Sequence, residues 1–129
     1  MEENPAQTYD FTDYYGGFVL MEKSVAGSIE KLVSAVKQTD IYATYSFQVK
    51  KIQRYPDLME QINAYREENF MLQSNFEGDE LFDKMEEFNS KYEQFLENPV
   101  VNDYLSAETA LCRMMQEINT NIIEGLDFQ

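Results

Sequence analysis

The sequence predicts an all-α fold, an antiparallel bundle of about five helices that ends in a long C-terminal helix. From Lys23 onward, apolar residues recur every three or four positions, which is the spacing that lines one face of a helix. Residues that start or stop helices stand where these apolar stripes end, so the local signals and the hydrophobic period agree. No β-strand is needed to account for the chain.

The first two predicted helices meet at Thr39 and Asp40, which serve as a stop and a restart. The apolar stripe of the first helix consists of Val25, Ile29, Leu32, Val33 and Val36. The second helix is predicted from Ile41 to about Arg54, with Tyr42, Tyr45, Val49 and Ile52 on one face. It ends before Pro56, because a residue that precedes proline disfavours the α conformation.

The third and fourth predicted helices are separated by Gly78. The third starts at Pro56, which suits a first helical turn, and its stripe is Leu58, Ile62, Tyr65, Asn69 and Leu72. Asp79 is predicted to cap the fourth helix. The inward face of that helix consists of Leu81, Met85, Phe88, Tyr92, Phe95 and Leu96.

The last helix is predicted to start after Asn98 and Pro99, to run from Val100 to about Glu124, and to close at Gly125. Its candidate packing stripe is Val101, Tyr104, Glu108, Leu111, Met115, Ile118 and Ile122. Such a helix is about 37 Å long, whereas a compact chain of this size has a radius of gyration of about 14 Å. The excess length predicts a homodimer in which this stripe forms the helix-helix interface.

Two residues of the last predicted helix, Glu108 and Cys112, have side chains that could take part in chemistry. Glu108 lies on the apolar stripe, where an unpaired carboxylate is costly. It is therefore expected to meet a donor, or else to lie where the stripe reaches the edge of the bundle. The candidate donors are Arg113, Arg66, a tyrosine hydroxyl or the amides at a helix start. Cys112 lies between apolar neighbours, and we interpret it as a small buried hydrophobe rather than a nucleophile.

The chain has the length of one domain, preceded by a segment of different composition. Residues 1–22 form an acidic, aromatic N-terminal tail without a base, and residues 23–129 form the helical domain. The aromatic residues of the tail are Tyr9, Phe11, Tyr14, Tyr15 and Phe18. The tail is either a flexible segment or one that docks on a partner or on another copy of the chain.

The charge balance limits the possible partners. Ten Lys and Arg residues stand against 24 Asp and Glu residues, a formal net charge of -14, which argues against direct binding to nucleic acid. No apolar run reaches the roughly 18 residues that suggest a membrane span. Residues 16–21 are too short an apolar run for a signal sequence. A single cysteine cannot form an internal disulfide, so we expect a cytoplasmic protein.

The sequence also argues against an enzyme. It contains no histidine, so the usual general base is absent and the Glu-x-x-His pattern of carboxylate metal sites cannot occur. No glycine-rich phosphate loop is present. We therefore expect no catalytic, cofactor or metal site. Lys50, Lys51 and Arg54 form the one basic cluster, which either complements the dipole at a helix C-terminus or binds an acidic partner.

Two long segments resemble the YlbF/YmcA-like family of small bacterial regulators. They are NPVVNDYLSAETALCRMMQEINTNIIEGLDF and, upstream, IYATYSFQVKKIQRYPDLMEQINAYREENFMLQ. The similarity covers residues 24 to 128. Its most specific parts are residues 98–101, Tyr104, Ala107 with Glu108, Leu111, and the spaced Ile118 and Ile122.

The resemblance implies a cytoplasmic, all-helical, dimeric regulator without known catalytic activity. Members of the family influence competence, sporulation and biofilm formation, and they assemble with proteins that direct RNA processing. Some work in complexes that hold iron-sulfur clusters, but one cysteine is too few for such a cluster, so we expect no cofactor. The leading hypothesis is a non-enzymatic adaptor that contacts other regulatory proteins. The alternative is an acidic structural protein that mimics nucleic acid and occupies a basic partner.

Overall fold

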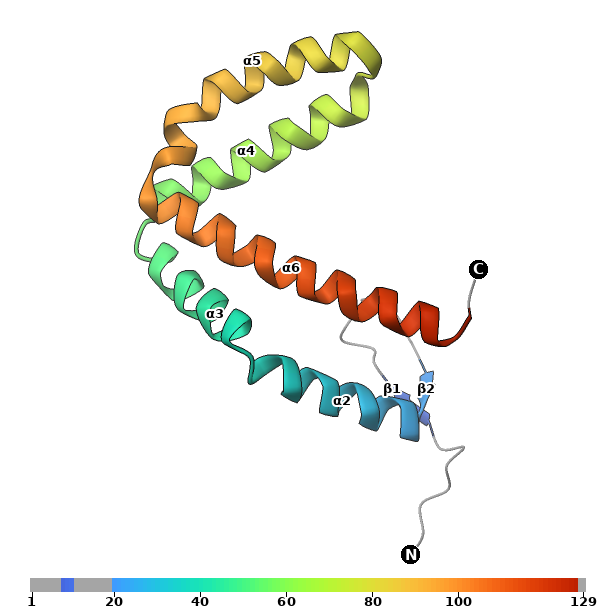
Figure 1. The fold of residues 1–129 in the computed structure, drawn as a ribbon. Coiled ribbons are helices and arrows are strands. Elements are labelled where there is room, and N and C mark those ends of the chain that lie inside the picture. Colours follow the sequence, from blue (N-terminus) through green and yellow to red (C-terminus); the bar gives the residue numbers. More distant parts are fainter. Residues whose placement is uncertain (1–7, 11–19, 128–129) are drawn as a thin grey trace, which may run out of the picture. The chain divides into compact units, whose positions relative to one another are not determined.

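A computed structural model describes residues 8–10 and 20–127 of the chain. Five helices make up nearly all of this part (Figure 1). They are α2 (Lys23–Lys37), α3 (Asp40–Ile52), α4 (Pro56–Asn75), α5 (Gly78–Glu97) and α6 (Pro99–Gly125). The chain divides into two compact units, Met1–Tyr42 and Ala43–Gln129. The prediction of five helices is confirmed, whereas their arrangement as one antiparallel bundle and the homodimer stay predictions.

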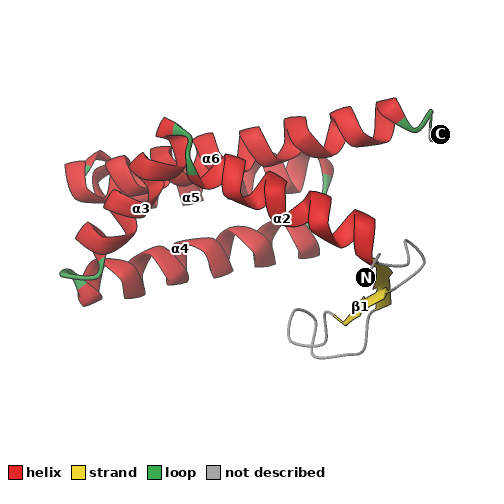
Figure 2. Ribbon diagram, turned by 90° about the horizontal axis from the view of Figure 1, so that it is seen from below, coloured by secondary structure: helices red, strands yellow, loops and turns green. Residues whose placement is uncertain are grey.

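The first unit contains a short pair of strands, so the expectation that no strand is present was wrong. Strands β1 (Thr8–Asp10) and β2 (Leu20–Glu22) pair antiparallel, with Tyr9 opposite Met21. Figure 2 shows them beside the start of α2, which both strands contact. Each strand is three residues long, too short for an alternating pattern to reveal it. The rest of the predicted tail, residues 1–7 and 11–19, lies outside the described residues.

Helix α2 presents an apolar face that the first unit does not bury. Ala26 is its one buried residue. The large apolar side chains Val25, Ile29, Leu32 and Val33 are exposed. The break after α2 is where the sequence predicts it, because the Thr39 hydroxyl donates to the carbonyl of Val36 at 2.7 Å and accepts from the amide of Tyr42 at 3.1 Å. Thr39 thus helps to close one helix and to start the next.

The core of the second unit lies where the end of α3, the start of α4, the end of α5 and the start of α6 meet. Its buried side chains are Ile52, Ile62, Val101 and Tyr104. Side chains of Val49, Leu58, Met59, Phe95, Leu96, Val100 and Leu105 pack around them. This core joins the four helices at one place and leaves the far ends of α4, α5 and α6 to other contacts.

Helices α4 and α5 form a hairpin that an aromatic cluster holds together (Figure 1). The ring centroids of Tyr65 and Phe88 are 5.1 Å apart, and those of Phe88 and Tyr92 are 4.9 Å apart. These separations are typical of stabilising aromatic pairs. Gly78 has a φ of +63°, a left-handed conformation that favours glycine. The predicted cap was wrong: α5 already starts at Gly78, so Asp79 lies in its first turn.

A second link between α4 and α5 is ionic. The Tyr92 hydroxyl donates to a carboxylate oxygen of Glu68 at 2.6 Å, and Lys91 Nζ lies 3.1 Å from both oxygens. The hydrogen bond from Tyr92, with help from Lys91, lowers the pKa of Glu68. The same hydrogen bond to the carboxylate raises the pKa of Tyr92 to about 12. The link therefore needs an ionised glutamate and a neutral tyrosine.

Helix α6 starts as the sequence predicts. The Asn98 side chain accepts a hydrogen bond from the amide of Val100 at 2.9 Å, and Pro99 occupies the first turn. The helix contains 27 residues, which makes it about 40 Å long. It leaves the α4–α5 hairpin near its start and runs away from it (Figure 1).

Replacing Ile62 by alanine should remove a fully buried side chain from the core of the second unit. We expect the free energy of unfolding to fall by about 2 to 5 kcal/mol, because the transfer energy is lost and a cavity remains. Urea denaturation followed by circular dichroism measures this change. The matched control is Ile123→Ala, at an exposed site on α6. A similar loss from both variants would contradict the described core.

Replacing Tyr92 by phenylalanine should lower the free energy of unfolding by about 1 kcal/mol at neutral pH. The raised pKa of Tyr92 means that its contribution is present below pH 10.0 and is lost as the pH rises through about 12. The lowered pKa of Glu68 means that its contribution is present above pH 4.5 and is lost at more acidic pH. Unfolding measured from pH 3 to 12 should therefore show the largest difference between wild type and variant at pH 6 to 9, and a smaller difference toward either end of the range. A difference that does not change with pH would contradict the link.

Candidate functional site

The apolar stripe of α6 changes its environment along the helix. Val101, Tyr104 and Ala107 are 0 to 6% exposed. Further along the helix, Met115 is 47% exposed and Ile122 is 50% exposed. We call Leu111, Met115, Ile118 and Ile122 the distal stripe. The sequence predicts the stripe itself, and the structure shows that the core of the second unit covers only its first part.

The stripe follows a heptad pattern. The intervals between Val101, Tyr104, Glu108, Leu111, Met115, Ile118 and Ile122 alternate between three and four residues. This alternation places all seven on one seam of the kind that packs against another helix. The positions that flank the seam carry no charge; they are Leu105, Ala107, Cys112, Met114, Asn119 and Asn121. Charged side chains near the distal stripe, Arg113 and Glu117, occupy the outer face of the helix.

Glu108 lies within the seam and has its donor in the same unit. Arg66 Nη2 of α4 is 2.5 Å from both carboxylate oxygens, and the Tyr104 hydroxyl donates to one of them at 3.4 Å. The Arg66 guanidinium also lies 5.8 Å from the centre of the Tyr104 ring, within cation-π range. Of the donors that the sequence suggests, Arg66 and a tyrosine hydroxyl are correct, and Glu108 is a partly buried, paired carboxylate.

The polar cluster alters the protonation of its neighbours. Burial alone would lower the pKa of Arg66, but its interactions with Tyr104 and Glu108 outweigh burial and raise it. Burial raises the pKa of Tyr45 on α3, and the nearby Tyr104 and Glu108 add to that effect. Arg66 thus stays charged and Tyr45 stays neutral at ordinary pH. The cluster links α4 to α6, and the charges of Arg66 and Glu108 act on Tyr45 of α3.

The interpretation of Cys112 as a buried residue was wrong, because its side chain is exposed. Apolar neighbours in the sequence suggested burial. In the structure, Cys112 flanks the seam rather than belonging to it, on a part of α6 that the second unit does not cover. Among the described residues, none forms a hydrogen bond or an ion pair with the thiol.

The basic residues lie together at the end of α3, where the sequence predicts them. Lys51 Nζ forms an ion pair with Asp103 of α6 at 3.3 Å. Both partners are substantially exposed, so the pair is expected to add little to stability. Lys50 and Arg54 make no ion pair with a described residue, and their charges remain available to solvent or a ligand.

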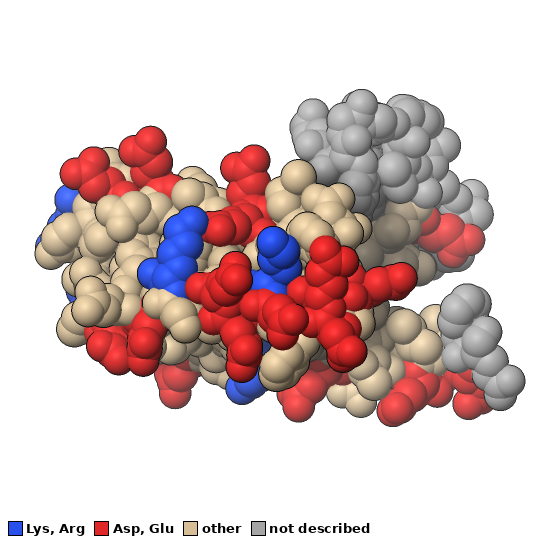
Figure 3. Space-filling model, turned by 90° about the horizontal axis from the view of Figure 1, so that it is seen from above, with Lys and Arg blue, Asp and Glu red and all other residues tan. Residues whose placement is uncertain are grey.

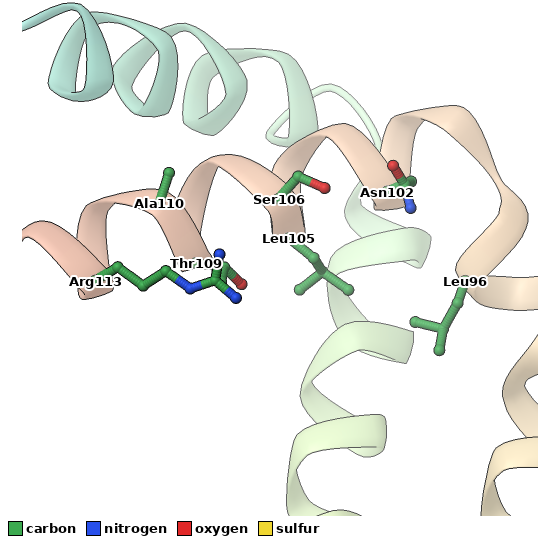
Figure 4. A pocket seen from close by; sticks show the side chains of 7 residues that line it. All are labelled: Leu96, Asn102, Leu105, Ser106, Thr109, Ala110 and Arg113. Atoms are coloured by element: carbon green, nitrogen blue, oxygen red, sulfur yellow. The ribbon is translucent and has the colours of Figure 1, made fainter.

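An open groove follows the outer face of α6 (Figure 4). Its volume is about 440 Å³, and it is lined by Leu96, Asn102, Leu105, Ser106, Thr109, Ala110 and Arg113. Leu96 lies at one end, and the Arg113 side chain extends from the other end so that its guanidinium lies near Thr109 (Figure 4). The groove contains no arrangement of nucleophile, base and oxyanion donor. Within residues 20–127, no group of three or more side chains suited to metal binding occurs.

Comparison with known proteins identifies one family. Residues 25–127 match the family described as control of competence regulator ComK, YlbF/YmcA. Searches among curated proteins and among solved structures gave no match. The matched range includes α2 from Val25 onward and all of α3 to α6, so the family resemblance seen in the sequence is confirmed.

The exposure of Cys112 can be tested with a thiol reagent. We expect the protein, diluted until size-exclusion chromatography shows a single copy, to react with Ellman's reagent without denaturant, to the extent of one thiol per chain, because the side chain is exposed within one chain and the chain has one cysteine. Cys112→Ser should change the free energy of unfolding by no more than about 0.5 kcal/mol. A thiol that reacts only after urea is added would show that Cys112 is buried within the folded chain and would contradict its exposure in the structure.

Proposed function

The chain belongs to the YlbF/YmcA family, whose members control the competence regulator ComK, and we propose that it is a non-enzymatic adaptor that acts as a homodimer. In this proposal it works in the cytoplasm by holding other regulatory proteins. Over residues 20–127, none of the helices is both long enough and apolar enough to cross a bilayer. The family supports the regulatory role, and the surface of α6 supports the mechanism.

The observation that carries the dimer is the exposed distal stripe. Met115 and Ile122 are about half exposed on a helix whose seam is buried at Tyr104, about three turns before Met115. An apolar seam left in water is unfavourable, and a patch of this kind marks an interaction surface. A second helix along this seam would cover Leu111, Met115 and Ile118.

A second copy of the chain is the occupant that the charges favour. Each chain has a formal net charge of -14, so two copies repel each other wherever their acidic surfaces meet. The distal stripe avoids this repulsion, because its four residues and the positions that flank them carry no charge. The same neutral surface on both copies can meet itself about a two-fold axis, as most homodimers do.

The alternative is an acidic protein that imitates nucleic acid. A mimic would concentrate its negative charge in one continuous array facing a basic partner. On the face shown in Figure 3, acidic side chains are numerous, but Lys and Arg side chains lie among them. Dispersed charge of this kind serves solubility. The adaptor is therefore the better supported function.

Ile122→Asp should separate the two copies. The substitution places a charge in the proposed interface, where burial without a partner is costly. We expect a folded monomer at micromolar concentration, measured by size-exclusion chromatography with light scattering, because Ile122 is half exposed within one chain and its loss should leave the helix intact.

Thr120→Asp is the matched control, because it adds the same charge two residues away on the outer face of α6. It should remain dimeric. A wild-type protein that is monomeric under these conditions, or equal dissociation by both variants, would contradict the proposed dimer. Loss of helical circular dichroism in Ile122→Asp would show instead that the residue supports the fold of one chain.

A further inference from the structure

A pocket at the end of α3 combines cations with aromatic side chains. Its volume is about 360 Å³, and it is lined by Phe47, Lys50, Lys51, Arg54 and Tyr55. These residues are spaced by three, one, three and one positions, so they share one helical face. Backbone hydrogen bonds from Arg54 to Lys51 and from Tyr55 to Ile52 extend the helical turn past the end of α3. The last two residues therefore stay on the same face.

The helix dipole explains only part of this surface. Cations near a helix C-terminus are stabilised by the exposed carbonyl groups, which accounts for Lys50, Lys51 and Arg54. The helix dipole does not account for the two large aromatic side chains beside these cations. Phe47 is 64% exposed and Tyr55 is 43% exposed. Exposed rings next to unpaired cations are a feature of binding sites rather than of helix ends.

The pocket is also an electrostatic exception in this chain. It holds three of the ten Lys and Arg residues, so the rest of the chain has seven against 24 acids, a formal charge of 7 − 24 = −17. An anionic ligand is attracted here and repelled elsewhere, which confines it to this site. Lys51 is held by Asp103, while Lys50 and Arg54 have no described ion pair and can meet a ligand.

We propose that this pocket binds a short acidic peptide segment of a partner protein, one that carries an aromatic side chain between carboxylates. The aromatic side chain packs against Phe47 and Tyr55, and the carboxylates accept hydrogen bonds from Lys50 and Arg54. The volume suits one side chain with its flanking groups rather than a folded surface. The proposal deepens the adaptor function by naming the chemistry of a partner, and it does not require the dimer.

Nucleic acid is the less suitable occupant of this site. Binding to a phosphate backbone gains affinity from many cations along a track, and the pocket offers three. Beyond the pocket, successive phosphates would face a surface with strong negative charge. A peptide with a few carboxylates beside one ring engages the pocket and extends no further.

The test uses the full chain and a fluorescent peptide with four aspartates around one phenylalanine, followed by anisotropy at low salt. We expect binding that Lys50→Ala and Arg54→Ala each weaken about twofold to fivefold, the effect of losing one exposed ion pair. Phe47→Ala should weaken it as well. Lys31→Ala is the control, because it removes an exposed cation from α2, outside the pocket, and should leave the affinity unchanged. Circular dichroism verifies that each variant is folded.

Two further peptides and one further variant separate the possible outcomes. A peptide with asparagines in place of the aspartates should bind much more weakly, because it lacks the carboxylates without being attracted to the acidic surface, and one with alanine in place of phenylalanine should also bind more weakly. The Ile122→Asp variant should bind the acidic peptide like wild type, so that failure of the dimer and failure of the pocket are distinguishable. The proposal is overturned if the acidic peptide does not bind at millimolar concentration or if the pocket variants bind it unchanged. Tighter binding of a single-stranded oligonucleotide to the same residues would also overturn it.

Discussion

Helix α6 is longer than the core that covers it, and the arrangement of its apolar seam follows from this difference. The core meets α6 only near its start, around Val101 and Tyr104. The apolar seam nevertheless continues with the same heptad spacing to Ile122. An apolar seam that continues for several turns beyond its core is unfavourable in water. The proposed homodimer follows from this constraint, and the family gives it a regulatory context.

The pair of Glu108 and Arg66 stands where the seam leaves the core. Both side chains are partly exposed, so the pair contributes modestly to stability, on the order of 1 kcal/mol. The pair matters because of where it lies, at the point where the seam leaves the core. Because Arg66 belongs to the same unit, Glu108 brings no unpaired charge to a second helix and needs no donor from another copy. A polar residue at such a seam position also disfavours other registers of two packed helices.

Much of the helical architecture could be predicted from the sequence, because proline, asparagine and the apolar period act locally. Pro56 and Asn98 start helices as expected, and Thr39 separates α2 from α3. The burial of Cys112 was predicted wrongly, because burial depends on which elements cover a helix, and the period of the sequence does not encode that. The two strands were missed for a related reason: three residues do not make a recognisable pattern. Arg66 could be named as one of several donors, but choosing it required the tertiary arrangement of α4 and α6.

Amide hydrogen exchange as a function of protein concentration tests the central claim most directly. If a second copy covers the distal stripe, amides of residues 111–124 should exchange slowly at high concentration and faster on dilution, while those of residues 100–108 stay unchanged. Fast exchange of residues 111–124 at every concentration would mean that nothing covers the stripe. Slow exchange that dilution does not affect would mean that the chain covers it by itself. Either of these last two results would contradict the account.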